Sequence, residues 1–289
     1  LYEVMEVAAQ LYRRNLEEPM AGKPAREYLE KRGFRSEDVA DCGLGFSFGE
    51  WRSLTDHLLK LGFGEDAVLG SGLAVKSAQG NVYDLFRGRL MFPIRNVRGK
   101  VVAFGGRALG EESPKYINSP ETDIFRKRKE FYGLHLAKRF VTAEDPRLFI
   151  VEGYLDQIRL YAAGLRYAVA TLGTALTEDH VRILKRFVTE AVLVYDGDKA
   201  GEMAALRGLE LFLKEGLAVK LIALPRGFDP DLLIREKGSE AFRELAREAK
   251  DIFDFKLEAL LRRYNKEDAA GLLRIVGEFA ETLAHVPNA

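Results

Sequence analysis

The sequence predicts an α/β protein in three parts, and three observations lead to this prediction. Helical spacing dominates the first eighty or so residues, short apolar strands follow up to residue 107, and strands alternate with helices from residue 147 onward. Such alternation is typical of βαβ units around a parallel sheet. We therefore predict a mixed α+β part at 1–140, a parallel α/β sheet at 141–235 and a helical part at 236–289.

The first part begins with helices and continues with an antiparallel sheet. Apolar spacing predicts helices at 4–16, 24–32 and 51–61, and the second of these has proline at its first position and a glycine after its end. Short apolar segments predict strands at 82–86, 89–95 and 101–107. The connection between the last two strands contains Asn96 and Gly99, so we expect them to form a hairpin.

The second part has the regular alternation of a parallel sheet. Apolar runs predict strands at 148–151, 167–171, 191–195 and 219–224, and helical spacing between them predicts helices at 155–163, 178–187 and 199–214. Thr177 is placed to cap the second helix. From residue 231 to the end the pattern is almost wholly helical, including segments at 242–249 and 252–264.

Composition is that of a globular protein in a reducing compartment. Of 289 residues, 47% are hydrophobic and 30% are charged, and no apolar run approaches the eighteen or so residues of a membrane span. Cys42 is the single cysteine, which excludes an internal disulfide and a zinc ribbon within this chain. We expect no membrane and a cytoplasmic location. Because the chain opens at Leu1 on a helical phase already under way, we also expect a fragment of a longer protein.

Acidic residues follow two of the predicted buried strands. Residues 149–156 read Phe-Ile-Val-Glu-Gly-Tyr-Leu-Asp, which places Glu152 at a strand end and Asp156 in the first turn of the next helix. Residues 192–198 read Val-Leu-Val-Tyr-Asp-Gly-Asp, which places Asp196 and Asp198 at the end of another strand. Parallel strands deliver their carboxyl ends to one edge of the sheet, so these acids are expected to meet there.

A third acidic pair completes the predicted site. Asp229 and Asp231 flank a proline between the last predicted strand and a helix, on the same edge of the sheet. Carboxylate oxygens suit a hard cation that keeps several waters and also binds substrate phosphates. The pattern therefore predicts a Mg²⁺ (or Mn²⁺) centre and phosphoryl or nucleotidyl chemistry.

Acidic residues at these positions also suggest helix caps, a calcium loop or a phosphatase motif. Any one acid is more often a helix cap than a ligand, but six at one edge exceed what capping requires. A calcium loop starting at Asp196 fails because Ala200 lacks a side-chain oxygen and Arg207 stands where a glutamate is required. An aspartyl-phosphate phosphatase, with Asp196 as nucleophile and Asp198 as acid, stays open as a minor alternative.

Basic residues are concentrated in a different segment. Between Arg87 and Lys129 there are eleven Lys or Arg and four Asp or Glu, a local balance of +7, although the whole chain has no net charge. The segment is expected to hold a polyanion, or else to be a solvated basic face. Aromatic residues lie among the arginines, and each is expected to belong to the core of a strand or to stack on a nucleic-acid base. These are Phe86, Phe92, Phe104 and Tyr116.

The acidic motifs resemble a known domain. Glu-Gly-Tyr-Leu-Asp at 152–156 with Asp-Gly-Asp at 196–198 is similar to the Toprim domain that bacterial primases, topoisomerases and some nucleases share. Further stretches resemble the bacterial replicative DNA primase family in particular. They are Arg-Gly-Arg-Leu-Met-Phe-Pro-Ile at 87–94, Phe-Gly-Gly-Arg at 104–107, Lys-Tyr-Ile-Asn-Ser-Pro-Glu-Thr at 115–122 and Thr-Leu-Gly-Thr-Ala at 171–175. The resemblance covers about residues 28–231.

This resemblance implies a function and a set of site residues. It implies a catalytic core that synthesises RNA primers from ribonucleoside triphosphates on single-stranded DNA in DNA replication, by two-metal nucleotidyl transfer. Glu152, Asp196 and Asp198 would be the principal metal ligands and catalytic acids, supported by Asp156, Asp229 and Asp231. The basic residues implicated in catalysis or in nucleic-acid contact are Arg107, Lys115 and Lys127, with Arg87 and Arg89 beside them; the alternative for the last two is pairing with acids such as Asp84.

The resemblance also implies partners and missing parts. Full-length members have a zinc-binding domain before this core and a helicase-binding domain after it, so zinc and the replicative helicase are expected only with those domains. The remaining partners would be the DNA template and a primer/DNA hybrid, at the replication fork. A Toprim nuclease or topoisomerase, or a protein that only binds single strands, stays open as an alternative.

Overall fold

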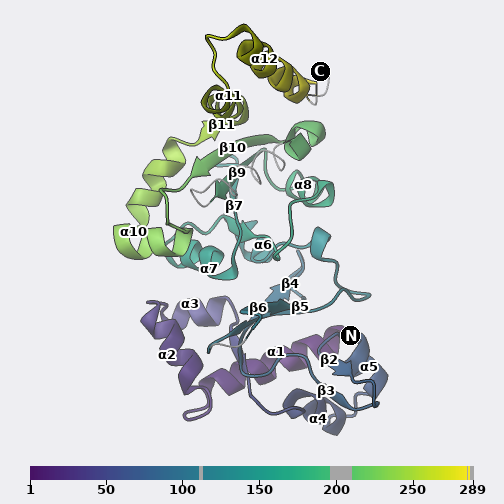
Figure 1. Ribbon diagram of the computed structural model, residues 1–289. Helices are drawn as coiled ribbons and strands as arrows, with labels where there is room; N and C mark the ends of the chain where they lie inside the picture. The colour runs from purple at the N-terminus through teal and green to yellow at the C-terminus, as the bar shows by residue number, and fades with distance from the viewer. Residues whose placement is uncertain (111–112, 196–209, 285, 287–289) are drawn as a thin grey trace. The chain divides into compact units, whose positions relative to one another are not determined.

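The computed structural model describes residues 1–110, 113–195, 210–284 and 286 (Figure 1). The chain forms two compact units, Leu1–His135 and Leu136–Ala289. Each unit has its own sheet and core, and each is described by itself below. The sequence predicts three parts with limits at 140 and 235, and this finer division stays a prediction.

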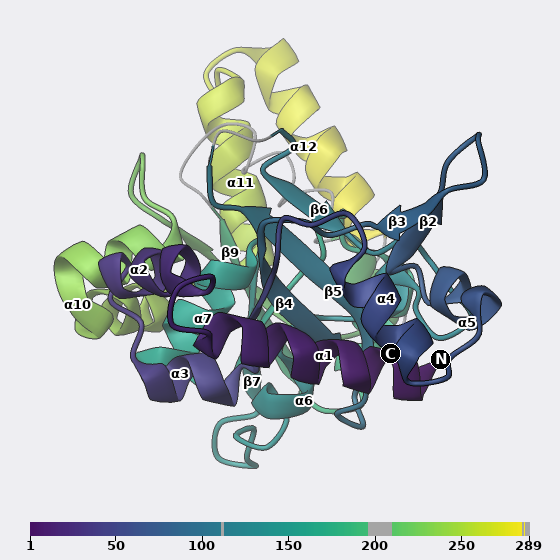
Figure 2. The ribbon, with the colours of Figure 1, turned by 90° about the horizontal axis from the view of Figure 1, so that it is seen from below.

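The first unit is built on a four-stranded antiparallel sheet. Its order is β1 (Gly45–Ser47), β4 (Arg89–Arg95), β5 (Val101–Ala108) and β6 (Tyr116–Asn118). The predicted hairpin is confirmed as β4 and β5, which pair from Arg89 opposite Ala108 to Arg95 opposite Val101. Helix α1 (Tyr2–Glu17) lies across this sheet (Figure 2) and buries Tyr12, whose ring meets Phe104 edge-on at 5.3 Å.

Short elements complete the first unit. They are α2 (Lys23–Lys31), α3 (Ser36–Asp41), α4 (Ser53–Lys60), α5 (Glu65–Gly70), β2 (Ala74–Lys76), β3 (Val82–Asp84), the 3₁₀ turn η1 (Lys127–Lys129) and α6 (Leu134–Ala137), which lies at the boundary between the units. The strand predicted at 82–86 ends earlier, at Asp84, and pairs with β2 in a separate two-stranded sheet. At its end the buried Asp84 carboxylate accepts hydrogen bonds from the Leu54 and Thr55 N–H groups at the start of α4.

The second unit is built on a five-stranded sheet. Its order is β11 (Lys250–Asp251), β10 (Ala218–Ala223), β9 (Glu190–Tyr195), β7 (Arg147–Val151) and β8 (Ala168–Ala170). The four predicted strands are confirmed and run parallel, as the alternation predicts. The antiparallel edge strand β11 was not predicted, because two exposed residues carry no alternating pattern.

Helices lie beside this sheet, except for the last of them. They are α7 (Tyr154–Ala162), α8 (Glu178–Leu184), α10 (Pro230–Arg247), α11 (Ile252–Arg263) and α12 (Ala269–Leu283). The last, α12, packs on α11 instead (Figure 1). The segment predicted at 242–249 lies in the second half of α10, beyond a kink at Gly238, whose φ is 81°. Most of the helix predicted at 199–214 falls outside the described residues.

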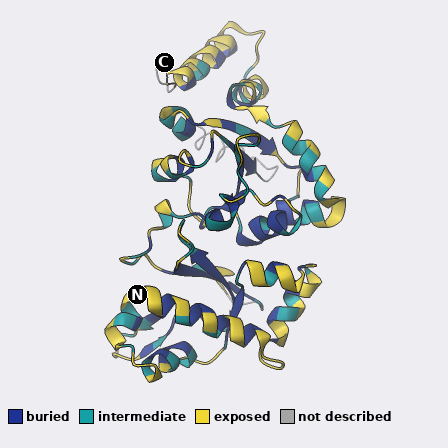
Figure 3. Ribbon diagram, turned by 180° about the vertical axis from the view of Figure 1, so that it is seen from behind, coloured by how far each residue is buried: buried dark blue, intermediate teal, exposed yellow. Residues whose placement is uncertain are grey.

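The core of the second unit runs along the strands, which are dark blue in the burial view (Figure 3). Phe149 in β7 is 1% exposed and lies between the rings of Tyr167 and Phe242, at 5.2 and 5.3 Å. This packing fixes α10 and β7 in one core. In the part of the chain that the structure describes, no helix is long and apolar enough to cross a membrane.

Candidate metal centre and nucleic-acid interface

Glu152 follows directly after β7, at the carboxyl edge of the parallel sheet. β7 pairs with β8 on one side and with β9 on the other, and Ile150 lies opposite Leu193 of β9. Two residues further along each strand, this register brings Glu152 level with Tyr195, the last residue of β9. The expected placement of Glu152 at a strand tip is therefore confirmed.

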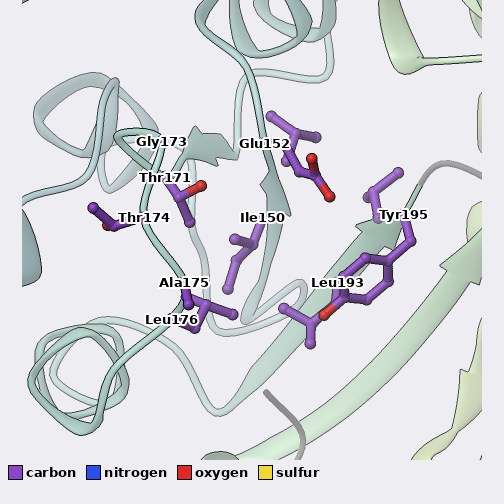
Figure 4. Close-up of a pocket in the computed structure, with 11 residues that line it drawn as sticks. Ile150, Glu152, Thr171, Gly173, Thr174, Ala175, Leu176, Leu193 and Tyr195 are labelled. Atoms are coloured by element: carbon purple, nitrogen blue, oxygen red, sulfur yellow. The ribbon is translucent and has the colours of Figure 1, made fainter. Parts of the chain in front are cut away.

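A pocket of about 460 Å³ opens at this edge (Figure 4). Glu152, Thr171 and Tyr195 line it from the ends of three neighbouring strands, together with the loop at 171–176 that follows β8. This loop turns at Gly173, whose φ of 69° favours glycine over any residue with a Cβ. The pocket therefore has one carboxylate at its rim and the Thr171 side chain on its wall, whereas the Thr174 side chain points away from it (Figure 4).

Tyr195 reports the electrostatics of the pocket. Burial raises the pKa of the Tyr195 phenol above its usual value, and the nearby Glu152 carboxylate raises it further. The phenol therefore stays protonated at neutral pH, as a neutral neighbour of the Glu152 charge. Tyr195 also immediately precedes Asp196 in the sequence.

Asp156 lies in the first turn of α7, close to Glu152 in the chain. Gly153 is the N-cap of this helix, and a Cβ built on it would lie 2.5 Å from Asp156 Oδ2. Any side chain at position 153 would displace the Asp156 carboxylate. The glycine therefore serves close approach here rather than an unusual φ, which is −110°.

Asp229 and Asp231 differ from each other in surroundings. Asp229 is exposed and caps α10, accepting a hydrogen bond from Leu232 N–H at 2.6 Å. Asp231 is 2% exposed and accepts a hydrogen bond from Arg159 Nε at 2.8 Å. The main-chain N–H of Asp231 donates to Asp156 Oδ1 at 3.3 Å, which joins the first and third acidic groups.

The donors that the structure describes fit a hard divalent cation only in part. Glu152 is exposed at the rim of the pocket, which suits a ligand, whereas Asp231 is already engaged in a buried ion pair. Asp196 and Asp198 lie outside the described residues. Among residues 1–110, 113–195, 210–284 and 286, no group of three or more acidic, histidine or cysteine side chains is arranged to hold a metal. The six ligand assignments therefore stay predictions.

Arg87 stacks on aromatic rings rather than pairing with the Asp84 carboxylate. Its guanidinium lies 4.2 Å from the centre of the Trp51 ring and 5.5 Å from that of Tyr83. Its Nη1 donates to the main-chain oxygen of Asp84, while the carboxylate of Asp84 binds the start of α4. Trp51 is 61% exposed, so the stack lies at the surface.

Arg89 is buried inside the first unit. It is 7% exposed, and its Nη1 donates to the main-chain oxygens of Pro114 and Gly106 at 3.0 and 3.4 Å. These bonds connect β4 to β5 and to the segment that leads into β6. A contact between Arg89 and nucleic acid stays a prediction.

Arg107 is held between two tyrosines. Its guanidinium lies 5.0 Å from the Tyr28 ring and 4.9 Å from the Tyr116 ring, and its Nη1 donates to the Tyr116 hydroxyl. The Arg107 side chain is 8% exposed, whereas Tyr116 is 37% exposed. Burial raises the pKa of the Tyr116 phenol, and the Arg107 charge opposes that rise.

The predicted lysines are more accessible. Lys115 is exposed beside Tyr116, and Lys127 lies half-buried in η1, where its main-chain N–H donates to Glu121 Oε1 at 3.2 Å. Phe86, Phe92 and Phe104 are 1% exposed or less. For these three residues the structure confirms the expectation that they belong to the core. Tyr116 alone of those four aromatic residues is available for stacking.

Several residues of these sites were not found by sequence reasoning. Tyr28, Trp51 and Arg159 contact site residues that lie far away in the chain, and no local pattern marks such pairs. Tyr195 could have been found, because it ends the strand that delivers Asp196. Arg159 also lies one helical turn after Asp156, on the same side of α7.

Each of the two units matches a known protein-family model over most or part of its length. The family model for the N-terminal domain of the DNA primase catalytic core matches residues 11–138, and the Toprim domain model matches residues 147–223. A curated DNA primase of Salmonella typhimurium is 40% identical over 296 residues, which covers 100% of this chain and 50% of that protein. The chain thus spans about half the length of the curated relatives it matches.

Solved structures share the fold along the whole chain. A crystal structure of a DNA primase domain from Pseudomonas aeruginosa is 40% identical and has a TM-score of 0.91, covering 99% of this chain and 90% of that one. A primase catalytic domain bound to single-stranded DNA is 38% identical, also with a TM-score of 0.91, covering 100% and 90%. This chain therefore belongs to the DNA primase family, of which it carries the catalytic-core and Toprim domains.

Proposed function

We propose that this chain synthesises short RNA primers from ribonucleoside triphosphates on a single-stranded DNA template. The observation that carries the proposal is Glu152 at the rim of a pocket where three parallel strands end, level with the residue that precedes Asp196. Membership of the DNA primase family supports this reaction over others that acids at a sheet edge can perform. DNA replication would be its setting, and the primer/DNA hybrid its product.

The metal centre of this proposal uses the acids at the sheet edge. Glu152 and Asp196 would hold one Mg²⁺ or Mn²⁺, and Asp198 would be the principal ligand of a second, with the other acids in support. When bound, such ions lower the pKa of an attacking hydroxyl and neutralise the charge on a triphosphate and its leaving pyrophosphate. The protein would contribute the position of each carboxylate, since phosphoryl transfer depends mainly on alignment and charge.

The pocket beside Glu152 supports a role in positioning. Thr171 offers a hydroxyl donor to a phosphate or sugar, and the apolar side chains of Ile150 and Leu193 exclude water from one side. The neutral phenol of Tyr195 adds no competing charge to the Glu152 carboxylate. These features favour a bound nucleotide over a bare inorganic ion.

Template binding would use the basic surface of the first unit. Arg87, Lys115 and Lys127 reach the surface or its margin, and lysine and arginine contacts to phosphate give affinity without sequence information. Arg89 and Arg107 are buried, so in this proposal they act by holding the surface in shape or by contact through Tyr116. A relative bound to single-stranded DNA supports such a template.

The test is Mg²⁺-dependent incorporation of labelled ribonucleotides on single-stranded DNA, with and without a pre-annealed primer. The wild-type chain is compared with Asp196→Asn and with the matched control Asp254→Asn, which changes an acid on α11. Incorporation that is lost in Asp196→Asn alone supports a template-directed polymerase. No incorporation even with primer, together with metal-dependent nicking of supercoiled DNA, would move the assignment to a Toprim nuclease or topoisomerase.

A further inference from the structure

A buried ion pair joins α7 to the first turn of α10. Arg159 Nε lies 2.8 Å from Asp231 Oδ1, and the two side chains are 8% and 3% exposed. A pair this far from water is stable only when its geometry is good and its other polar atoms are satisfied. The contact connects two helices that are 72 residues apart in the sequence.

Further polar contacts surround the same carboxylate. Arg235, one turn along α10, has its Nη1 3.7 Å from Asp231 Oδ2. The main-chain N–H of Asp231 donates to Asp156 Oδ1 at 3.3 Å. Each carboxylate oxygen of Asp231 therefore faces a guanidinium group, while its backbone holds the neighbouring acid Asp156.

This arrangement disfavours a divalent cation on Asp231. A cation that shared its oxygens would lie within a few ångströms of two positive guanidinium groups, and the repulsion from the buried Arg159 would be little screened by water, whereas the exposed Arg235 would add a weaker repulsion. Glu152 differs in this respect, because it is exposed at the rim of the pocket. The two acids therefore cannot be equivalent members of one ligand set.

We infer that Asp231 is a positioning residue and not a metal ligand: with Arg159 it fastens the start of α10 to α7, and so holds Asp156 and Asp229 at the edge of the sheet. This inference rests on the proposed function, because it divides the acids of the same site into ligands and supports. Asp229 caps α10 and is exposed, so the tie at Asp231 sets where the Asp229 side chain lies. Ligation then falls to Glu152 and to the acids that follow β9.

The first test is thermal unfolding of a double-mutant cycle. Arg159→Met and Asp231→Asn each leave a buried group without its partner, and each is expected to lower Tm by about 10 °C. Arg159→Met/Asp231→Asn closes the cycle by removing both charges and should unfold at a higher temperature than either single variant, because no unpaired charge remains buried. Arg159→Lys should recover part of the loss. Additive losses in the cycle would overturn the pairing.

The second test measures Mn²⁺ binding by the electron paramagnetic resonance signal of the free ion, without any nucleotide. Asp231→Asn, studied below its unfolding temperature, is expected to change the Mn²⁺ dissociation constant by less than about twofold. Glu152→Gln is expected to weaken binding at least about tenfold. If Asp231→Asn weakens Mn²⁺ binding as much as Glu152→Gln, Asp231 is a ligand and the inference is wrong.

The two tests separate this inference from the proposed function. If Glu152→Gln leaves Mn²⁺ binding unchanged, the metal centre of the proposed function fails, and the division of its acids fails with it. If ribonucleotide incorporation fails while Glu152→Gln weakens Mn²⁺ binding and Asp231→Asn does not, the reaction has been misassigned but the inference stands. The mutant cycle reports on the tie between α7 and α10 in either case.

Discussion

The two sheets of this protein present their charged residues in opposite ways. In the second unit, acids follow the ends of parallel strands, so Glu152 lies at an open edge beside a pocket. In the first unit, the arginines lie within or beside antiparallel strands, and Arg89 and Arg107 are turned into the protein. A strand end exposes a charge by its position, whereas a charge within a strand must be satisfied by the residues packed on it.

The difference shows in the partners of each charge. Arg107 lies between Tyr28 and Tyr116 and is only 8% exposed, so its cationic charge is balanced by aromatic faces and a phenol. Glu152 is exposed, and its charge is felt by the buried Tyr195 phenol. The acidic edge therefore leaves its carboxylate accessible, whereas the basic sheet encloses two of its arginines.

The largest expected effect concerns whether the two regions have independent cores. Phe149→Ala in the second unit and Phe104→Ala in the first each remove a ring that is 1% exposed, and each should cost about 3–5 kcal/mol of unfolding free energy. Hydrogen exchange should show lost protection only in the unit that carries the change. Loss of protection in both sheets from either variant would mean that the regions unfold as one and cannot be compared separately.

The next effect tests the acidic edge. Glu152→Gln removes the charge at the rim and keeps the side-chain shape, so primer extension should fall at least about 100-fold, with Tm changed by no more than about 2 °C. Glu178→Gln, an acid on α8 in the same unit, is the control and should keep full activity. An equal loss of primer extension in both variants would show that activity depends on the total negative charge of this unit and not on the position of Glu152.

A smaller effect concerns an acid inside the basic region. Burial raises the pKa of Glu130, which follows η1, from the ordinary value of 4.5 to about 7. The folded chain therefore holds this proton more tightly than the unfolded chain, and unfolding free energy should fall by about 1–3 kcal/mol as pH rises from about 4.5 to about 7. Denaturant titrations across this pH range should show the fall in wild type.

Glu130→Gln should remove this pH dependence and raise stability at pH 8 by the same amount. Glu50→Gln, an exposed acid of the same unit, should keep it. A wild-type stability that is level from pH 4.5 to 7 would show that a neighbouring charge compensates the burial of Glu130.

The smallest effect tests the surface of the basic region. Lys115→Ala should weaken single-stranded DNA binding by about two- to threefold at moderate salt, and should lower the slope of log affinity against log salt by about 0.7. Fluorescence anisotropy with oligonucleotides of different sequence should show the same change for each. Lys60→Ala, on α4 and outside the basic segment, should leave the slope unchanged.

Much of the fold could be predicted from local patterns. The alternation after residue 147 predicts four parallel strands, all of which are present, and the turn between 95 and 101 predicts the β4–β5 hairpin. The strands β1, β2, β6 and β11 were missed because segments of two or three residues hold too little periodicity to be recognised. The strand predicted at 82–86 is present only over 82–84, and its pairing with β2 in a separate sheet was not specified by the sequence.

What the sequence by itself determined is the set of acids at strand ends, because a buried parallel strand followed by a carboxylate fixes both the residue and its edge of the sheet. Only the tertiary structure decided what those acids and the basic residues contact. Arg159 reaches Asp231 across 72 residues, and Tyr28 in α2 covers Arg107 in β5, so neither pairing leaves a local signal. Periodicity records which face of an element is buried, whereas the partner on that face depends on how distant elements pack.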